Sequence, residues 1–365
     1  MTIEDFALLF TRGIGSRGAA HLIDYFGSAE ALFGASRAEL IEGAGLRTEL
    51  AERILAREGM SLAEREIKYC RKHNIRALAA TDEEYPSLLR DTPDRPHVLF
   101  VCGDVAALAG SMLSVVGTRA MTPHGQHITT SLVGDLATMV DDLVVVSGLA
   151  YGVDAAAHRA ALAHGVRTVA VVANALPDVT PAAHRSLADD ILRNGGAIVS
   201  ELHSATRQNG TLFLARNRII AALSAATLVA ESPASGGSLA TADIADSYHR
   251  VVLALPGRAS DSASFGSNNL IRTGKARLVL TAADLLEDVG WQCSVPTQSC
   301  TESEKLQLTD AQSRIYDIIS SEQTIDMDTL LARSSMSFGE LSMVIMELEL
   351  KGVIRCLAGR KYEKI

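Results

Sequence analysis

The sequence has few cysteines and few aromatic residues for its length. Its 365 residues include five cysteines, at positions 70, 102, 293, 300 and 356, and no two of them form a CxxC pair. An odd and scattered set of this kind excludes a disulfide framework and predicts reduced thiols in a cytoplasmic protein. Aromatic residues make up 4% of the chain, which leaves few rings for stacking interactions.

Long apolar runs are also missing. No run approaches the roughly 18 residues that a membrane helix needs. The first residues, MTIEDFALLFTRGIG, carry early acids and lack a basic segment ahead of a long apolar stretch, so we expect no signal peptide. Because both features are lacking, we expect a cytoplasmic protein without membrane contact.

The sequence has fewer basic than acidic residues. The chain has 34 Lys and Arg against 43 Asp and Glu, a formal net charge of -9. Any nucleic-acid binding must therefore come from a local basic patch. The hydrophobic content of 47% and charged content of 21% are typical of a globular protein, and the length predicts two or three domains.

Residues 1–78 are predicted to form a small all-α domain. Apolar residues recur at helical spacing in LLFTRGIGSRGAAHLIDYFG, and the triplets GIG (13–15) and GAG (43–45) separate helical stretches. This pattern indicates a repeated helix-hairpin-helix, whose backbone N–H groups can face a phosphate. The alternative, a helical bundle in which the glycines only end helices, stays equally open.

Residues 79–290 alternate short Val- and Ile-rich runs with helical stretches at 124–140, 153–164, 182–194 and 236–248. Such a pattern predicts a Rossmann-like, doubly wound and mostly parallel sheet with helices on both faces. Residues 291–305 are predicted to be a linker. Residues 306–365 carry three helical segments and a final hairpin, the pattern of a winged helix. Ligands of the central domain should lie at the carboxyl ends of its strands.

Four segments with phosphate-binding chemistry are assigned to loops at these strand ends. They are VVGTRAMTPHG, VSGLAYGVD, FLARNRII and ESPASGGSLATA. None contains a Walker loop or a GxGxxG turn, so no nucleotide cofactor is expected. Gly, Ser, Thr and Arg recur in them instead, and their amides, hydroxyls and guanidinium groups suit phosphate.

The stretch between Glu201 and Glu231 contains no acidic residue but has Arg207, Arg216 and Arg218. It predicts a basic surface, with internal pairing of Arg216 or Arg218 to Glu231 or Asp243 as the alternative. Asp154 and His158, one helical turn apart, could serve a metal or a base. No further ligand or HExxH motif accompanies them, so we expect no metal site and no catalysis there.

The motifs VVGTR, VVSGLAYGVDAAAHRAAL, GAIVSE, FLARNRIIAALS, SGGSLATA, LALPG and GSNNLIRTGKARLV occur in an order and spacing that resemble the DNA-processing protein A (DprA/Smf) family, over residues 81–290. The resemblance implies a homodimer without catalytic turnover. It would bind and protect incoming single-stranded DNA and load RecA recombinase during natural transformation. Self-association is expected near Leu270, Ile271 and Leu278, which are apolar and expected to be exposed; the alternative is that these three belong to the domain core.

The resemblance also implies a set of DNA-binding residues. Arg119 matches the arginine of a G-[ST]-R motif, Phe213 to Arg218 match F-x-x-R-N-R, and residues 235–241 match a serine- and glycine-rich loop. The expected site residues are Gly117, Thr118, Arg119, Ser147, Gly148, Phe213, Arg216, Asn217, Arg218, Ser235, Gly236, Gly237, Ser238, Thr241 and Lys275.

The sequence departs from the family pattern at several positions. A tyrosine-proline pair is replaced by Thr180-Pro181, and the basic residue that often follows is missing. Leu214 and His249 stand where the family has proline and glycine, and Lys275 stands in place of alanine.

Two other functions fit the sequence less well. PASGGSLATADIAD is similar to the loop of lysine-decarboxylase-like phosphoribohydrolases, which hydrolyse nucleotides, but Ile244 stands where those enzymes need a catalytic glutamate. A winged-helix transcription factor is disfavoured because its recognition segment, SFGELSMVIMELEL, carries three glutamates and no Lys or Arg, and would repel phosphates.

Overall fold

The computed structural model describes residues 1–207, 209–293, 309–320, 324–334, 336–350, 353–357 and 361–364. The chain divides into two compact units, Met1–Val295 and Pro296–Ile365, and each is described by itself. Most of the predicted linker, residues 294–305, lies outside the described residues. Cys70, Cys102, Cys293 and Cys356 carry free thiols.

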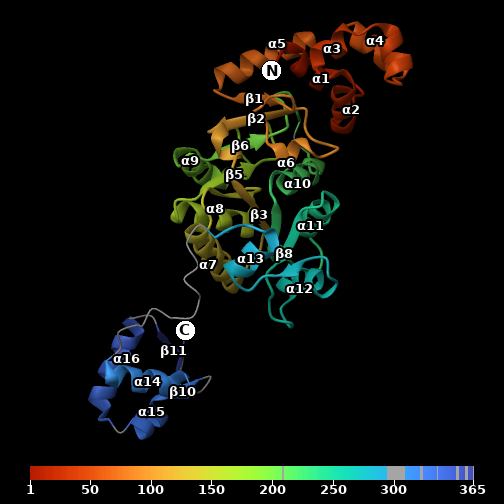
Figure 1. Cartoon of the computed structure of the whole chain (residues 1–365). Helices are drawn as coiled ribbons and strands as arrows, with labels where there is room; N and C mark the ends of the chain where they lie inside the picture. Colours follow the sequence, from red (N-terminus) through yellow and green to blue (C-terminus); the bar gives the residue numbers. More distant parts are fainter. Residues whose placement is uncertain are drawn as a thin grey trace. The chain divides into compact units, whose positions relative to one another are not determined.

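The first unit contains one sheet of nine strands (Figure 1). Its strands are β1 Arg76–Ala79, β2 Val98–Gly103, β3 Ser111–Gly117, β4 Leu143–Ser147, β5 Arg167–Val171, β6 Ala197–Ser200, β7 Ala226–Glu231, β8 Val251–Ala254 and β9 Arg277–Leu278. Its helices are α1 Ile3–Phe10, α2 Ser16–Phe26, α3 Ala29–Gly34, α4 Thr48–Leu55, α5 Met60–Lys72, α6 Ser87–Arg90, α7 Pro123–Met139, α8 Val153–Ala163, α9 Arg185–Arg193, α10 Thr211–Leu223, α11 Gly237–Ser247, α12 Phe265–Arg272 and α13 Ala282–Val289.

The strand order is β1-β2-β6-β5-β4-β3-β7-β8-β9, and the seven strands from β6 to β9 run parallel. β1 and β2 add antiparallel pairs at one edge. The chain winds outward from β3 through β4, β5 and β6, then returns to β7 on the other side of β3. The sheet therefore has its switch point between β3 and β7, where such sheets bind ligands.

The central strands supply side chains to both faces of the sheet. In β4, Val144 and Val146 pack in one core, whereas Leu143 and Val145 pack in another. The first core includes residues of α10, α11 and α12, and the second includes residues of α7, α8 and α13. Fully apolar strands are needed because both faces are covered. The predicted doubly wound α/β class is confirmed.

Helices α1 to α5 gather beside β1 and β2 (Figure 1). They share a hydrophobic core with β2, which includes Phe6, Leu32 and Phe100, and Met1–Val295 forms one compact unit. Gly13 and Gly45 have φ values of +94° and +67°, so the two glycine triplets do turn the chain between helices. Phosphate contact by these turns, and a separate domain ending at residue 78, stay predictions.

The second unit is a winged helix, as predicted. Its helices are α14 Asp310–Ser320, α15 Met327–Ser334 and α16 Phe338–Leu350, and its strands are β10 Ile325–Asp326, β11 Ile354–Leu357 and β12 Lys361–Lys364. The strands form one antiparallel sheet in the order β10-β12-β11. Among the described residues of the whole chain, none of the helices has the length and apolar character of a membrane span.

Candidate functional site

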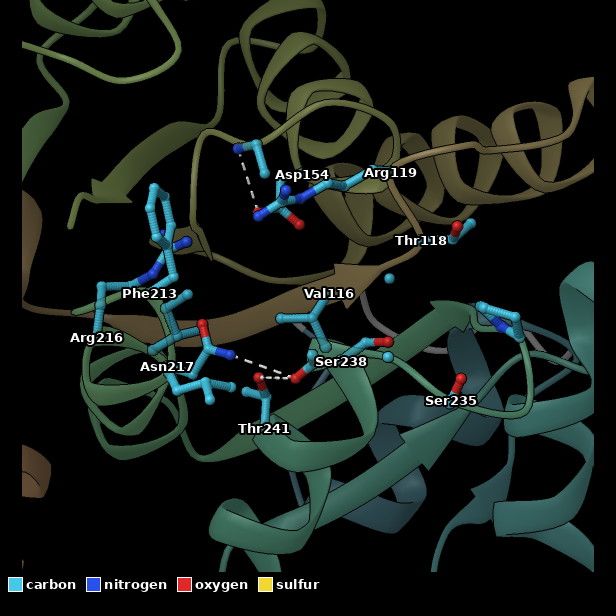
Figure 2. Close-up of a pocket in the computed structure, with 17 residues that line it drawn as sticks. Val116, Thr118, Arg119, Asp154, Phe213, Arg216, Asn217, Ser235, Ser238 and Thr241 are labelled. Carbon is cyan, nitrogen blue, oxygen red and sulfur yellow. Dashed lines mark hydrogen bonds between the residues drawn. The ribbon is translucent and has the colours of Figure 1, made fainter. Parts of the chain in front are cut away.

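A pocket of about 340 Å³ lies at the switch point of the sheet, next to the carboxyl ends of β3 and β7. The loops after β3, β4 and β7 line it together with one side of α10 (Figure 2). Its lining residues are Val116, Gly117, Thr118, Arg119, Ala150, Asp154, Phe213, Leu214, Arg216, Asn217, Ile220, Pro233, Ser235, Gly236, Gly237, Ser238 and Thr241.

The pocket brings together most of the residues that the sequence predicted. The predicted residues in its lining are Gly117, Thr118, Arg119, Phe213, Arg216, Asn217, Ser235, Gly236, Gly237, Ser238 and Thr241. The other four, Ser147, Gly148, Arg218 and Lys275, do not line it. These segments are far apart in the sequence and meet because parallel strands end at one edge of the sheet.

Arg119 is the exposed cation of the pocket. Its guanidinium carbon lies 5.8 Å from the centre of the Phe213 ring, within the range of a cation–π interaction. Within the described part of the chain, its guanidinium group makes neither a hydrogen bond nor an ion pair. A guanidinium group in this position can donate hydrogen bonds to a phosphate, while the half-buried ring beside it contacts a base.

FLARNRII was predicted to be a loop at a strand end, and this is wrong. It lies in helix α10, where Arg216 and Ile220 are one turn apart and both are buried. The helical period places Phe213, Arg216, Asn217 and Ile220 on the side that faces the pocket. Ile219 and Ile220, which follow Arg218 directly, belong to the hydrophobic core that covers one face of the sheet, and the loop assignment overlooked them.

Arg216 is a buried part of the pocket and not an exposed basic residue. It is 6% exposed, and its Nη1 donates to the carbonyl oxygens of Gly148, over 2.7 Å, and of Val171. Nε is buried without a hydrogen-bond partner in the described structure. Burial lowers the pKa of Arg216, and the nearby Asp154 carboxylate opposes this shift. The guanidinium group thus ties the ends of β4 and β5 to α10.

Gly148 serves this arrangement and does not line the pocket. A Cβ atom at Gly148 would lie 2.1 Å from Nη1 of Arg216. Gly148 was expected among the DNA-binding residues, but the structure places the guanidinium group of Arg216, and not the pocket, against it. Ser147 is also fully buried, and its hydroxyl donates to the carbonyl oxygen of Val115 over 2.6 Å.

The basic surface predicted between Glu201 and Glu231 is smaller than expected, because Arg216 is buried and Arg218 is paired, whereas Arg207 is exposed. Arg218 forms an ion pair with Glu201, and its Nη1 donates to the carbonyl oxygen of Asp94 over 2.6 Å. Lys275 pairs with Asp243 at 2.8 Å, and both side chains are exposed. Glu201, the partner of Arg218, precedes the acid-free stretch, and Asp243, the partner of Lys275, follows it. The absence of acids within the stretch therefore did not show that these cations are paired.

Asp154 is a pocket residue that the sequence analysis did not assign to the site. It is 7% exposed, and its carboxylate accepts a hydrogen bond from the backbone N–H of Ala150 at 3.3 Å (Figure 2). Burial raises its pKa, and the neighbouring Arg216 opposes this. Its place in the first helical turn after a strand-end glycine loop was the available signal in the sequence.

His158 lies under the pocket and does not line it. The ring is fully buried, its Nδ1 lies 2.7 Å from the hydroxyl of Thr168, and that hydroxyl donates to the carbonyl oxygen of Val145. Burial lowers the pKa of His158 to about 3, so the ring is neutral. Among the described residues, no group of three or more His, Cys, Asp or Glu is placed to hold a metal ion.

The loop after β7 supplies small polar groups at the start of α11. The hydroxyls of Ser232 and Ser238 lie 2.9 Å apart, and the hydroxyl of Thr241 donates to the carbonyl oxygen of Gly237 over 3.0 Å. Nδ2 of Asn217 donates to the same oxygen over 3.3 Å, which joins α10 to the loop. The N–H groups of the first turn of α11 have no partners inside the helix, so this end favours an anion.

Comparisons with known proteins agree with this geometry. The family described as DNA recombination-mediator protein A matches residues 76–290, and the DprA winged helix domain matches residues 301–360. The chain is 32% identical to "Putative DNA processing protein DprA" of Mycobacterium tuberculosis, covering 86% of this chain and 83% of that one. It is 33% identical to "Protein Smf" of Escherichia coli, with 88% and 86% covered.

Two solved structures are also similar. DNA processing protein A from Streptococcus pneumoniae matches with a TM-score of 0.68 at 29% identity, over 79% of this chain and 98% of that one. The protein from Helicobacter pylori, described for its single-stranded DNA binding mode, matches with a TM-score of 0.52 at 28% identity, over 58% and 94%. From its sheet, its pocket and these matches, the chain belongs to the DNA-processing protein A (DprA/Smf) family.

Proposed function

We propose that this protein binds single-stranded DNA in the pocket at the switch point. The observation that carries the proposal is the exposed guanidinium group of Arg119, which lies beside the Phe213 ring and has no partner among the described residues. The first turn of α11 adds N–H groups that have no partner within the helix, and Ser235 and Ser238 add hydroxyls in the same pocket. These groups suit the phosphates and bases of a single strand.

Phosphate contacts should dominate the affinity, because the pocket has one half-buried ring and several groups that suit an anion. Affinity should therefore fall steeply with salt and vary little with base sequence. An electrophoretic mobility shift assay should compare one labelled single strand with its duplex over a series of salt concentrations. Equal binding of both forms, or a salt-independent affinity, would overturn the proposal.

We further propose that the protein acts without catalytic turnover, and that it protects incoming DNA and loads RecA recombinase during transformation. His158 is neutral and buried away from the pocket, and Ile244 stands where a phosphoribohydrolase needs a glutamate. Incubation with AMP should release no adenine. In a strand-exchange reaction, the protein should shorten the lag of RecA assembly on a single strand that is already coated by a single-strand binding protein.

Self-association through the β9 edge is also proposed. Leu278 and Leu280 are 43% and 66% exposed at this edge of the sheet. Leu270, which we had expected to be exposed, packs in the core, and Ile271 packs against it. Light scattering should give about twice the chain mass of 38.7 kDa, and Leu280→Lys should lower that mass. A single-chain mass for the unaltered protein at micromolar concentration would contradict a dimer.

A further inference from the structure

The loop between β4 and α8 presents an exposed aromatic ring beside the pocket. Tyr151 is 50% exposed, whereas Leu149, two residues earlier, is fully buried. Ala150 and Asp154, on either side of Tyr151 in the sequence, both line the pocket. Single exposed apolar residues are ordinary on protein surfaces, so the exposure alone assigns no role. The second observation is that Tyr151 lies in a loop whose neighbouring residues form part of the pocket wall.

The Tyr151 ring is held by a buried side chain. It packs edge-on against His184, with ring centres 4.8 Å apart and an angle of 62° between the planes. His184 is 5% exposed, and its Nδ1 donates to the carbonyl oxygen of Leu149 over 2.7 Å. Leu149 has a φ of +57°, an uncommon conformation for a bulky residue. The contact with His184 therefore fixes this loop and the ring that it carries.

The same loop packs directly against the segment that carries Arg119. Val153 donates its N–H to the carbonyl oxygen of Thr118 over 3.1 Å. A Cβ atom at Gly152 would lie 2.7 Å from the carbonyl carbon of Arg119, so only glycine permits this approach. Tyr151 is therefore the residue before Gly152, which packs against the backbone of Arg119. A strand whose phosphate was held by Arg119 would therefore lie beside the loop that carries Tyr151.

We propose that Tyr151 is a stacking platform for an unpaired nucleobase, next to the nucleotide held by Arg119 and Phe213. This inference rests on the proposed function and extends the binding surface by one base. A ring that is fixed before binding loses little conformational freedom when a base stacks on it. A base would stack on the face of the Tyr151 ring and would not contact its hydroxyl, so the platform should bind all bases alike.

The experiment measures binding of a labelled oligothymidylate by fluorescence anisotropy over a series of salt concentrations. Tyr151→Leu keeps an apolar side chain but removes the flat ring, and should weaken binding by about five- to one-hundredfold, the range of one lost base stack. Tyr151→Phe should bind like the unaltered protein. Because no phosphate contact is lost, the slope of log affinity against log salt should stay unchanged in Tyr151→Leu.

Tyr25 provides a matched control. It is 52% exposed and packs edge-on against Phe26, with ring centres 4.8 Å apart, but it lies in α2. Tyr25→Leu should leave affinity unchanged. A second readout uses strands that carry the fluorescent base 2-aminopurine at successive positions, because stacking on a ring quenches its fluorescence. In Tyr151→Leu the quenching should be lost at one position of the strand only, which a merely structural role of Tyr151 would not produce.

The outcomes separate the two proposals. If the unaltered protein does not bind single strands, the proposed function and the platform are both wrong. If the unaltered protein binds and Tyr151→Leu has the same affinity and quenching pattern, only the platform is wrong. A uniform loss of quenching together with a lower melting temperature in Tyr151→Leu would also overturn the platform, because the residue would then act through folding.

Discussion

Nη1 of Arg216 donates a hydrogen bond to the carbonyl oxygen of Gly148 over 2.7 Å, at a point where Gly148 has no room for a side chain. This contact joins α10 to the end of β4 beneath the pocket. The arginine therefore builds the floor of the site, whereas Arg119 above it is exposed and without a partner in the described structure. The two arginines should respond to substitution in different ways.

Gly148→Ala should destabilise the protein. The new Cβ would lie 2.1 Å from Nη1 of Arg216, so the guanidinium group must move and its hydrogen bonds must lengthen. We expect a loss of about 1–3 kcal/mol in the free energy of unfolding, as for other overpacked sites. Gly236→Ala is the control, because the nearest atoms there lie 3.7 Å away. Urea unfolding of the two variants measures the difference, and equal stability would contradict this account of Gly148.

Arg216→Met should reduce stability strongly, because it leaves the buried Asp154 without its neighbouring positive charge. The carbonyl oxygens of Gly148 and Val171 also lose their hydrogen bonds from Arg216, and each buried group left without its partner costs about 1–3 kcal/mol. Adding Asp154→Asn should restore part of the stability, since the unpaired charge is then gone. Thermal melts of the single and double variants test this. A double variant that is no more stable than Arg216→Met would show that the two side chains are not coupled.

Arg119→Ala should weaken binding to single strands of any sequence while the melting temperature stays unchanged. The lost charged contact is worth roughly 1.5–3 kcal/mol, and less where solvent screens it. The slope of log affinity against log salt should fall by about one. Arg193→Ala, which removes an exposed arginine from α9, is the control. Unchanged affinity and slope for Arg119→Ala would remove the principal support for the proposed function.

His158 should make the protein less stable in acid. Its pKa is lowered to about 3 in the folded state, against an ordinary value of 6.5, so the unfolded chain binds a proton that the folded protein does not. Stability from this group is complete above about pH 6.5 and is lost toward pH 3, by at most about 1.4 kcal/mol per pH unit. His158→Ala should be less stable at neutral pH, with a shallower pH dependence.

Urea unfolding of the unaltered protein and of His158→Ala, at matched pH values between 7 and about 4, gives the two pH profiles. Parallel profiles would show that His158 does not titrate in this way. Loss of DNA binding by a His158→Ala protein that melts normally would instead assign the Asp154–His158 pair a functional role, which we do not expect from the buried and neutral ring.

The sequence alone was sufficient to predict the class of fold. Apolar runs such as 143–147 and 226–231 have no polar alternation, and this pattern arises only where helices cover both faces of a sheet. The winged helix was predictable from three short helical periods and a final hairpin. The family resemblance implied most of the pocket residues, and those in the loops after β3 and β7 meet because loops that follow parallel strands gather at one edge.

The sequence did not determine which of these residues are exposed. Arg119, Arg216 and Arg218 have the same side chain. In the described part of the chain, Arg119 is exposed without a hydrogen bond or ion pair, Arg216 is buried against backbone carbonyls, and Arg218 is paired with Glu201. Those partners lie 68 and 17 residues away from their arginines, so only tertiary packing brings them together. The sequence determined where the pocket forms. The tertiary structure decided which charges remain free, because a guanidinium group that is satisfied inside the fold is no longer available to a phosphate.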